Sequence, residues 1–185
     1  PPPLPRQCMP RPGRSASIPP TMVRKLTQAA PGTLVVLEHV SRILEDNPLR
    51  DPHVRKLGVW LPPQYDGAGA RSGRRFPVLY DLVGFTGSGL SHVGWKPFGD
   101  SVPERAARLV HEGKMGPAII VFPDCFTALG GNQYVNSSAI GNYADYLTRE
   151  IIPFVDREFR TLASREHRGC FGKSSGGYGS IIRAR

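Results

Sequence analysis

GKSSGG, at Gly172–Gly177, is the stretch of this chain that decides its fold. The stretch has the spacing G-x-S-x-G and directly follows a short apolar run. A serine on a tight turn from a strand into a helix has a strained backbone, and side chains two residues before and after it would clash. Because Gly172 and Gly176 stand at those positions, the hydroxyl of Ser174 can project from the end of a sheet. The motif predicts a strand, a sharp turn with an exposed serine, and a helix.

The residues before this motif show strand patterns separated by loops. β-branched or continuous apolar runs predict five strands, at 33–44, 54–61, 76–83, 118–122 and 168–171. Stretches rich in glycine or polar residues predict loops at 67–75, 84–89 and 123–141.

Two further segments have apolar residues at helical spacing. The first, 103–114, begins with a proline, which suits the first turn of a helix. The second, 143–159, is expected to be capped by Asn142 and kinked at Pro153. Two strands followed by the order β-loop-α-β-α-β predict an α/β fold with a mostly parallel central sheet flanked by helices.

The first 31 residues differ in composition from the rest. Eight of the first 20 residues are proline, without helical or strand periodicity, so residues 1–31 are predicted to form a disordered arm. Residues 32–185 are predicted to form one folded domain that ends just after the motif. The chain starts without methionine and stops eleven residues beyond Ser174, so we expect it to be part of a longer protein.

Charge and hydropathy exclude several classes of protein. The formal net charge is +9, but the basic residues are scattered and several lie in the arm, so a nucleic-acid partner is not expected. No apolar run approaches the roughly 18 residues of a membrane span. Without a secretory signal pattern, a cytoplasmic location is expected. Nothing in the sequence specifies an oligomeric state.

The cysteines and carboxylates offer no metal site. Cys8, Cys125 and Cys170 form no CxxC pair, and their odd number predicts no disulfide framework. Cys170 is interpreted as a core residue, and Cys125, in a loop, as a weaker candidate for a reactive thiol. No HExxH spacing or paired carboxylates are present, so neither a metal nor another cofactor is expected.

Two alternative interpretations of the motif are weaker. Residues 172–174 resemble the end of the phosphate-binding pattern GxxxxGK[ST], but that pattern needs a glycine where this chain has His167. An inert glycine-rich turn is the other alternative. The preceding apolar strand and the glycine-rich start of the following helix argue against it.

A serine that transfers acyl groups also needs two hydrogen-bond donors directed at the developing oxyanion. The backbone N–H of Ser175, which follows the candidate nucleophile, is one expected donor. The second is expected after the third strand, where Gly84 lets the chain turn and Phe85 supplies a backbone N–H. A merely flexible loop at 84–89 is the alternative.

The proton acceptor for Ser174 is less evident. In enzymes with this strand-turn-helix motif, the acid and the histidine follow the serine in the chain. We therefore expect both partners to follow residue 185. Of the histidines before Ser174, His92 lies beside the expected oxyanion donors and is the candidate to reach the site. The five are His39, His53, His92, His111 and His167.

Further motifs accompany the serine: FPVLY at 76–80, NQYVNS at 132–137, YADYLTREIIPFVD at 143–156 and RT at 160–161. Together they resemble the esterase family of α/β-hydrolases that includes esterase D (S-formylglutathione hydrolase), feruloyl and enterochelin esterases, and mycolyltransferases. The resemblance covers residues 54–185 and implies Ser174 as nucleophile, with Phe85 and Ser175 as oxyanion donors. It implies that residues 32–185 are the N-terminal part of an α/β-hydrolase domain. The chain departs from the family at Val83-Gly84, where relatives often have His-Gly or Asp-Gly.

The predicted function is hydrolysis of a small-molecule carboxylic ester or thioester through an acyl-enzyme on Ser174. Transfer of the acyl group to an alcohol is the enzymatic variant. Tyr134 is expected to contact the substrate or, alternatively, to pack beneath the 123–141 loop. The alternative of another class is an inactive fragment or binding module of the same fold, in which the fifth strand would be an exposed apolar edge.

Overall fold

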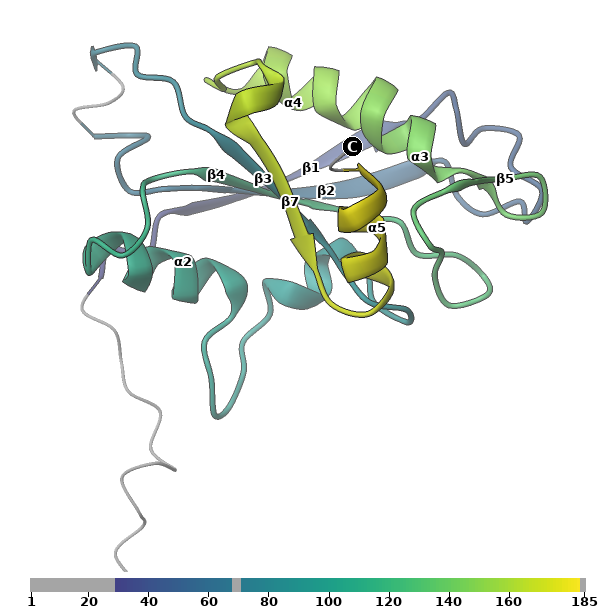
Figure 1. The fold of residues 1–185 in the computed structure, drawn as a ribbon, viewed down its shortest axis with the longest axis horizontal. Coiled ribbons are helices and arrows are strands. Elements are labelled where there is room, and N and C mark those ends of the chain that lie inside the picture. Colours follow the sequence, from purple (N-terminus) through teal and green to yellow (C-terminus); the bar gives the residue numbers. More distant parts are fainter. Residues whose placement is uncertain (1–28, 68–70, 184–185) are drawn as a thin grey trace, which may run out of the picture.

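A five-stranded mixed sheet with the order β1-β2-β4-β3-β7 forms the centre of the fold (Figure 1). The computed structural model describes residues 29–67 and 71–183. β2 is antiparallel to β1 and β4, whereas β3 is parallel to β4 and β7, which confirms the expected α/β fold. Within the described residues, β7 is an edge strand. The strands are β1 (Thr33–Val40), β2 (Val54–Leu61), β3 (Val78–Leu82), β4 (Ile119–Pro123) and β7 (Arg168–Gly172).

Helices cover both faces of this sheet (Figure 1). One face is covered by α2 (Val102–His111), which begins with a capping box between Ser101 and Glu104. The other is covered by one helical segment made of α3 (Tyr143–Asp145), the π-helical η3 (Tyr146–Ile151) and α4 (Ile152–Glu158). The remaining elements are α5 (Ser175–Arg183), two 3₁₀ turns, η2 (Gly89–His92) and η4 (Arg165–His167), and the short strands β5 (Asn136–Ser137) and β6 (Gly141–Asn142).

The second predicted helix forms with two local differences. Asn142 occupies the N-cap position but makes no capping bond with its side chain. The carboxamide oxygen of Asn136 instead accepts the N–H of Asp145 at 3.0 Å. A kink was expected at Pro153; the irregularity that the structure shows is the π-helical η3, which directly precedes the proline-containing α4.

The first strand ends at Val40, four residues earlier than expected, because a turn follows that is fastened to η3. Ser41 Oγ accepts the N–H of Leu44 and donates to Glu150 Oε2 at 2.5 Å. Glu150 Oε1 accepts the N–H groups of Arg42 and Ile43 at 2.9 and 3.0 Å. Burial acts to raise the pKa of Glu150, but these hydrogen bonds outweigh it and lower the pKa.

The last three residues of the arm predicted to be disordered, 29–31, are ordered against the folded domain. Ala29 is buried, and the indole N–H of Trp60 donates to the carbonyl of Pro31 at 2.8 Å. The folded part of the chain therefore includes residues 29–31. The prediction for residues 1–28 lies outside the described residues.

Alternating side chains of the central strands build a core on each face of the sheet. In β4, Ile119 and Val121 face the α3–α4 side, whereas Ile120 and Phe122 face the α2 side. All four are buried, which accounts for the continuous apolar sequence of this strand. The carboxyl ends of β3 and β7 are thereby held side by side, and the serine motif follows one of them.

We expect Glu150→Gln to lower the free energy of unfolding by about 2 kcal/mol at neutral pH, because a carboxylate that accepts several hydrogen bonds is replaced by a neutral amide. Since the pKa of Glu150 is lowered in the folded state, the stability it contributes is present above the unfolded pKa and lost as pH falls through the folded pKa. Urea denaturation at neutral and acidic pH measures this. Glu38→Gln, on the exposed face of β1, is the control, and an equal loss in both variants would contradict the role of Glu150.

Candidate active site

Ser174 lies on the turn between β7 and α5 and is exposed. Its backbone φ is +57°, a left-handed conformation that non-glycine residues rarely adopt. A Cβ at Gly172 would lie 2.2 Å from the carbonyl oxygen of Leu82, and a Cβ at Gly176 would lie 1.7 Å from the same atom. Both glycines are therefore required by the close approach of the turn to the end of β3. The strand, turn and helix that the motif predicts are present.

A cleft of about 390 Å³ opens beside Ser174. One wall is formed by Lys173 and Ser174, and the other by residues 83–87 together with Ser91 and His92. A Cβ at Gly84 would lie 3.6 Å from Ser174 Cβ, so the loop after β3 passes directly beside the serine. A larger hollow of about 510 Å³, lined by residues of β3, η3, α4, η4, β7 and α5, does not include Ser174.

The two expected oxyanion donors come from the two chain segments that meet at this cleft. Ser175 is the first residue of α5, where an N–H has no acceptor within the helix. Phe85 follows Gly84 and lines the cleft. The adjacent Thr86 has φ +67°, and its N–H donates to the carbonyl of Gly130 at 2.6 Å, so the loop is held in place by a second loop.

Glycine at positions 130 and 131 makes room for the Phe85 ring. A Cβ at Gly130 or Gly131 would lie 3.4 or 3.3 Å from ring atoms of Phe85, and both glycines have positive φ. The side chain of Phe85 thus lies against this glycine pair, although 47% of the residue is exposed. The loop after β3 is braced by these contacts, which a merely flexible segment would lack.

Tyr134 packs beneath the loop and is 2% exposed. Its hydroxyl donates to the carbonyl of Val83 at 2.6 Å, and its N–H donates to Asn132 Oδ1 at 2.6 Å. Burial raises the pKa of Tyr134, so the phenol stays a donor. Of the two interpretations of Tyr134, this arrangement favours packing beneath the loop, since the hydroxyl holds the strand end that leads to Gly84.

A buried arginine anchors the start of the 123–141 loop. Arg55 is 4% exposed and donates to the carbonyl of Phe126 at 2.7 Å and to the hydroxyl of Tyr143 at 2.9 Å. Its guanidinium also lies 3.6 Å from Asp124. Burial raises the pKa of Tyr143 to about 12, against the effect of the Arg55 charge. No sequence pattern indicates this anchor, because its members are far apart along the chain.

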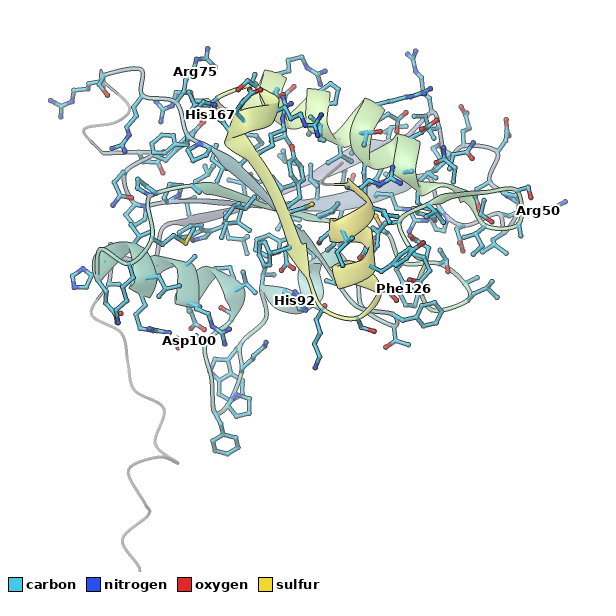
Figure 2. All side chains as sticks on the ribbon, viewed as in Figure 1. Arg50, Arg75, His92, Asp100, Phe126 and His167 are labelled. Carbon is cyan, nitrogen blue, oxygen red and sulfur yellow. The ribbon has the colours of Figure 1, made fainter. Side chains whose placement is uncertain are left out.

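Of the histidines, His92 lies at the cleft beside Ser174, whereas His39 and His167 lie elsewhere. His92 lies in η2, lines the cleft, and its Nδ1 is 2.7 Å from Asp81 Oδ2 (Figure 2). His39 is beside Glu150, and His167 precedes β7, at the opposite end of that strand from Ser174. The sequence singled out His92 but missed Asp81. The available signal was a single acidic residue within the apolar run of residues 76–83.

Among the described residues, the cysteines and acidic side chains form no second candidate site. Cys125 is buried, and burial raises the pKa of its thiol, which disfavours the reactive thiolate considered for it. Cys170 is partly buried and packs against the core. Across residues 29–67 and 71–183, no three His, Cys, Asp or Glu side chains gather as metal ligands, and no helix is long and apolar enough to cross a membrane.

The sheet order, the crossover helices and the strained serine between β7 and α5 together define an α/β-hydrolase fold. Residues 52–185 match the Esterase family, described as "Putative esterase". The chain belongs to this family.

Solved structures with the same fold include esterases. A ferulic acid esterase is 25% identical with a TM-score of 0.62, over 80% of this chain and 50% of that chain. A ferulic acid esterase from Anaeromyces mucronatus in complex with ferulic acid is 24% identical with a TM-score of 0.63, over 86% of this chain and 55% of that chain. An S-formylglutathione hydrolase from Agrobacterium tumefaciens is 20% identical with a TM-score of 0.59, over 85% of this chain and 55% of that chain. The chain spans about half the length of these structures.

We expect Gly176→Ala to lower the free energy of unfolding by about 3 kcal/mol or more, because its Cβ would overlap the Leu82 carbonyl. Gly177→Ala is the matched control. Its Cβ would come no closer than 3.4 Å to Gly172 O, so replacing a helical glycine should stabilise by up to about 1 kcal/mol. Urea denaturation of both variants tests the pair. Equal stability of the two would contradict the packing of α5 on β3.

Tyr134→Phe should lower the free energy of unfolding by about 1–2 kcal/mol, because the buried carbonyl of Val83 loses its donor. Tyr178→Phe is the control, since Tyr178 is 51% exposed and should change stability by less than about 0.5 kcal/mol. Thermal and urea unfolding measure both. A neutral Tyr134→Phe variant that binds an ester substrate less tightly would restore the substrate-contact interpretation.

Proposed function

We propose that this chain carries the nucleophile of an enzyme that hydrolyses small-molecule carboxylic esters or thioesters, with Ser174 as the attacking residue. The observation that carries the proposal is the exposed serine at φ +57° between β7 and α5, beside a cleft. Membership of the Esterase family and the similarity to ferulic acid esterases support the same reaction class.

The proposed reaction proceeds through an acyl-enzyme. Ser174 Oγ attacks the substrate carbonyl carbon and loses its proton to a base. The backbone N–H groups of Ser175 and Phe85 stabilise the negative charge on the carbonyl oxygen, the interaction that commonly supplies the largest single contribution to such catalysis. The alcohol or thiol leaves with a proton, and water then releases the acid.

The cleft suits a substrate of modest size. Its wall combines the exposed aromatic ring of Phe85 with the polar Thr86, Ser91 and Lys173. An acyl group with an apolar or aromatic part can lie against Phe85 while its carbonyl approaches Ser174. Aryl esters such as p-nitrophenyl acetate are therefore suitable first substrates.

Ser174→Ala should abolish hydrolysis of p-nitrophenyl acetate and covalent labelling by a fluorophosphonate probe, because the attacking oxygen is removed. Loss of a nucleophile in such a site typically lowers the rate by several orders of magnitude. Ser164→Ala, at the opposite end of β7, is the control and should leave both signals unchanged. The absorbance of released p-nitrophenolate measures hydrolysis, and mass spectrometry of the labelled peptide measures the reaction with the probe. A chain that neither hydrolyses nor labels would favour the binding-module alternative.

A further inference from the structure

A loop between η2 and α2 exposes two aromatic side chains beside the Ser174 cleft. Trp95 is 70% exposed and Phe98 is 80% exposed. These are the two largest exposed fractions among the large hydrophobic residues that the structure describes. Exposed apolar side chains that gather in one place, rather than scatter singly, mark surfaces that bind something. The segment that carries both rings, residues 94–99, is named the aromatic loop.

The aromatic loop stands clear of the rest of the molecule. A Cβ at Gly94 or at Gly99 would meet no atom within 4 Å, so both ends of the loop border open space. Figure 1 shows the segment between η2 and α2 extending away from the sheet, beyond both of these elements. Its starting point is fixed, because a Cβ at Gly89 in η2 would lie 2.4 Å from the carbonyl oxygen of Phe122. The two rings are therefore carried on a projection with a firm base.

The tip of the aromatic loop is positively charged. Lys96 lies between the two aromatic residues in the chain and is exposed. The acidic side chains that follow it are engaged elsewhere. Asp100 Oδ2 accepts a hydrogen bond from Arg108 at 3.0 Å, and Glu104 Oε2 accepts the N–H and the hydroxyl of Ser101. The charge of the Lys96 ammonium group is thus available to an anionic partner, in a chain whose formal net charge is +9.

Two aromatic rings around a lysine suit the surface of a lipid bilayer. Tryptophan is favoured at the boundary between lipid and water because its ring is apolar and its N–H is polar. A lysine close to an anionic leaflet adds electrostatic attraction. A stable protein interface commonly covers about 800 Å² of each partner. The aromatic loop instead offers a narrow projection with open space at Gly94 and Gly99, which favours insertion into a soft surface over docking to a protein.

We propose that the aromatic loop docks this protein to anionic lipid surfaces. Trp95 and Phe98 enter the headgroup region, and Lys96 lies against lipid phosphate or carboxylate groups. The cleft wall formed by Ser91 and His92 directly precedes the loop in the chain, so docking brings the cleft close to the lipid. Docking does not use the hydroxyl of the candidate nucleophile, and it is therefore separable from the proposed reaction.

Intrinsic fluorescence reports docking directly, because the two tryptophans of this chain differ in exposure. Trp95 is 70% exposed, whereas Trp60 is 1% exposed. Vesicles of phosphatidylcholine with about one-third phosphatidylserine provide the anionic surface. They should shift the emission of the unaltered chain to shorter wavelength, and brominated lipids in the vesicles should quench it. In Trp95→Ala, neither change is expected, because the remaining indole of Trp60 is buried.

Co-sedimentation with the same vesicles measures the contribution of each side chain. The double variant Trp95→Ala/Phe98→Ala should bind at least about tenfold more weakly, because two aromatic side chains no longer leave water. Lys96→Gln should bind anionic vesicles about fivefold more weakly and should bind vesicles of phosphatidylcholine alone like the unaltered chain. Val36→Ala/Val40→Ala is the matched control, since both valines are exposed on β1, and it should bind normally.

Each outcome decides between docking and its absence. No sedimentation and no emission shift of the unaltered chain would overturn the inference. Equal binding by Trp95→Ala/Phe98→Ala and by the valine control would also overturn it, because binding would then use another surface. Circular dichroism establishes that every variant is folded. Ser174→Ala should bind vesicles like the unaltered chain, so a failure of ester hydrolysis would count against the proposed function and leave docking standing.

Discussion

The close approach of the β7–α5 turn to the carbonyl of Leu82 is the constraint on which the site depends. β3 and β7 run parallel and side by side, and the chain must reverse into α5 directly over the end of β3. Only glycine at positions 172 and 176 permits this, because any Cβ there would overlap the Leu82 oxygen. This tight turn gives Ser174 a positive φ and leaves its side chain exposed at the end of the sheet.

The same end of β3 organises the rest of the cleft. Val83 is held by the Tyr134 hydroxyl, Gly84 passes beside Ser174, and Asp81 binds His92. Residues 81–84 at this strand end therefore accept the Tyr134 hydroxyl, pass beside Ser174 and bind an imidazole. The loop after β3 is also held by a second loop, because the N–H of Thr86 donates to the carbonyl of Gly130.

Sequence patterns predicted the regular parts of the fold well, because those parts are governed by local periodicity. Residues 54–61 form the expected strand, and the serine motif lies between the expected strand and helix. Local patterns did not predict element ends that are set by hydrogen bonds from residues distant in the chain. The first strand ends at Val40 because Glu150 fastens the next turn, and the helix after Asn142 takes its cap from Asn136. The sequence left Tyr134 between substrate contact and packing, because a loop tyrosine gives no sign that its hydroxyl will meet Val83.

The sequence by itself determined the α/β class and singled out Ser174, since a G-x-S-x-G spacing after an apolar strand is a local requirement of backbone geometry. Only the tertiary structure decided what surrounds that serine. Asp81 and His92 come from a strand and a separate turn, and their pairing depends on how η2 packs against the end of β4 and over Gly58 in the middle of β2. That packing joins residues far apart in the chain. The pairing of Asp81 and His92 beside Ser174 therefore depends on the tertiary fold. The position of the serine itself, on a turn between a strand and a helix, is predicted by the six consecutive residues 172–177.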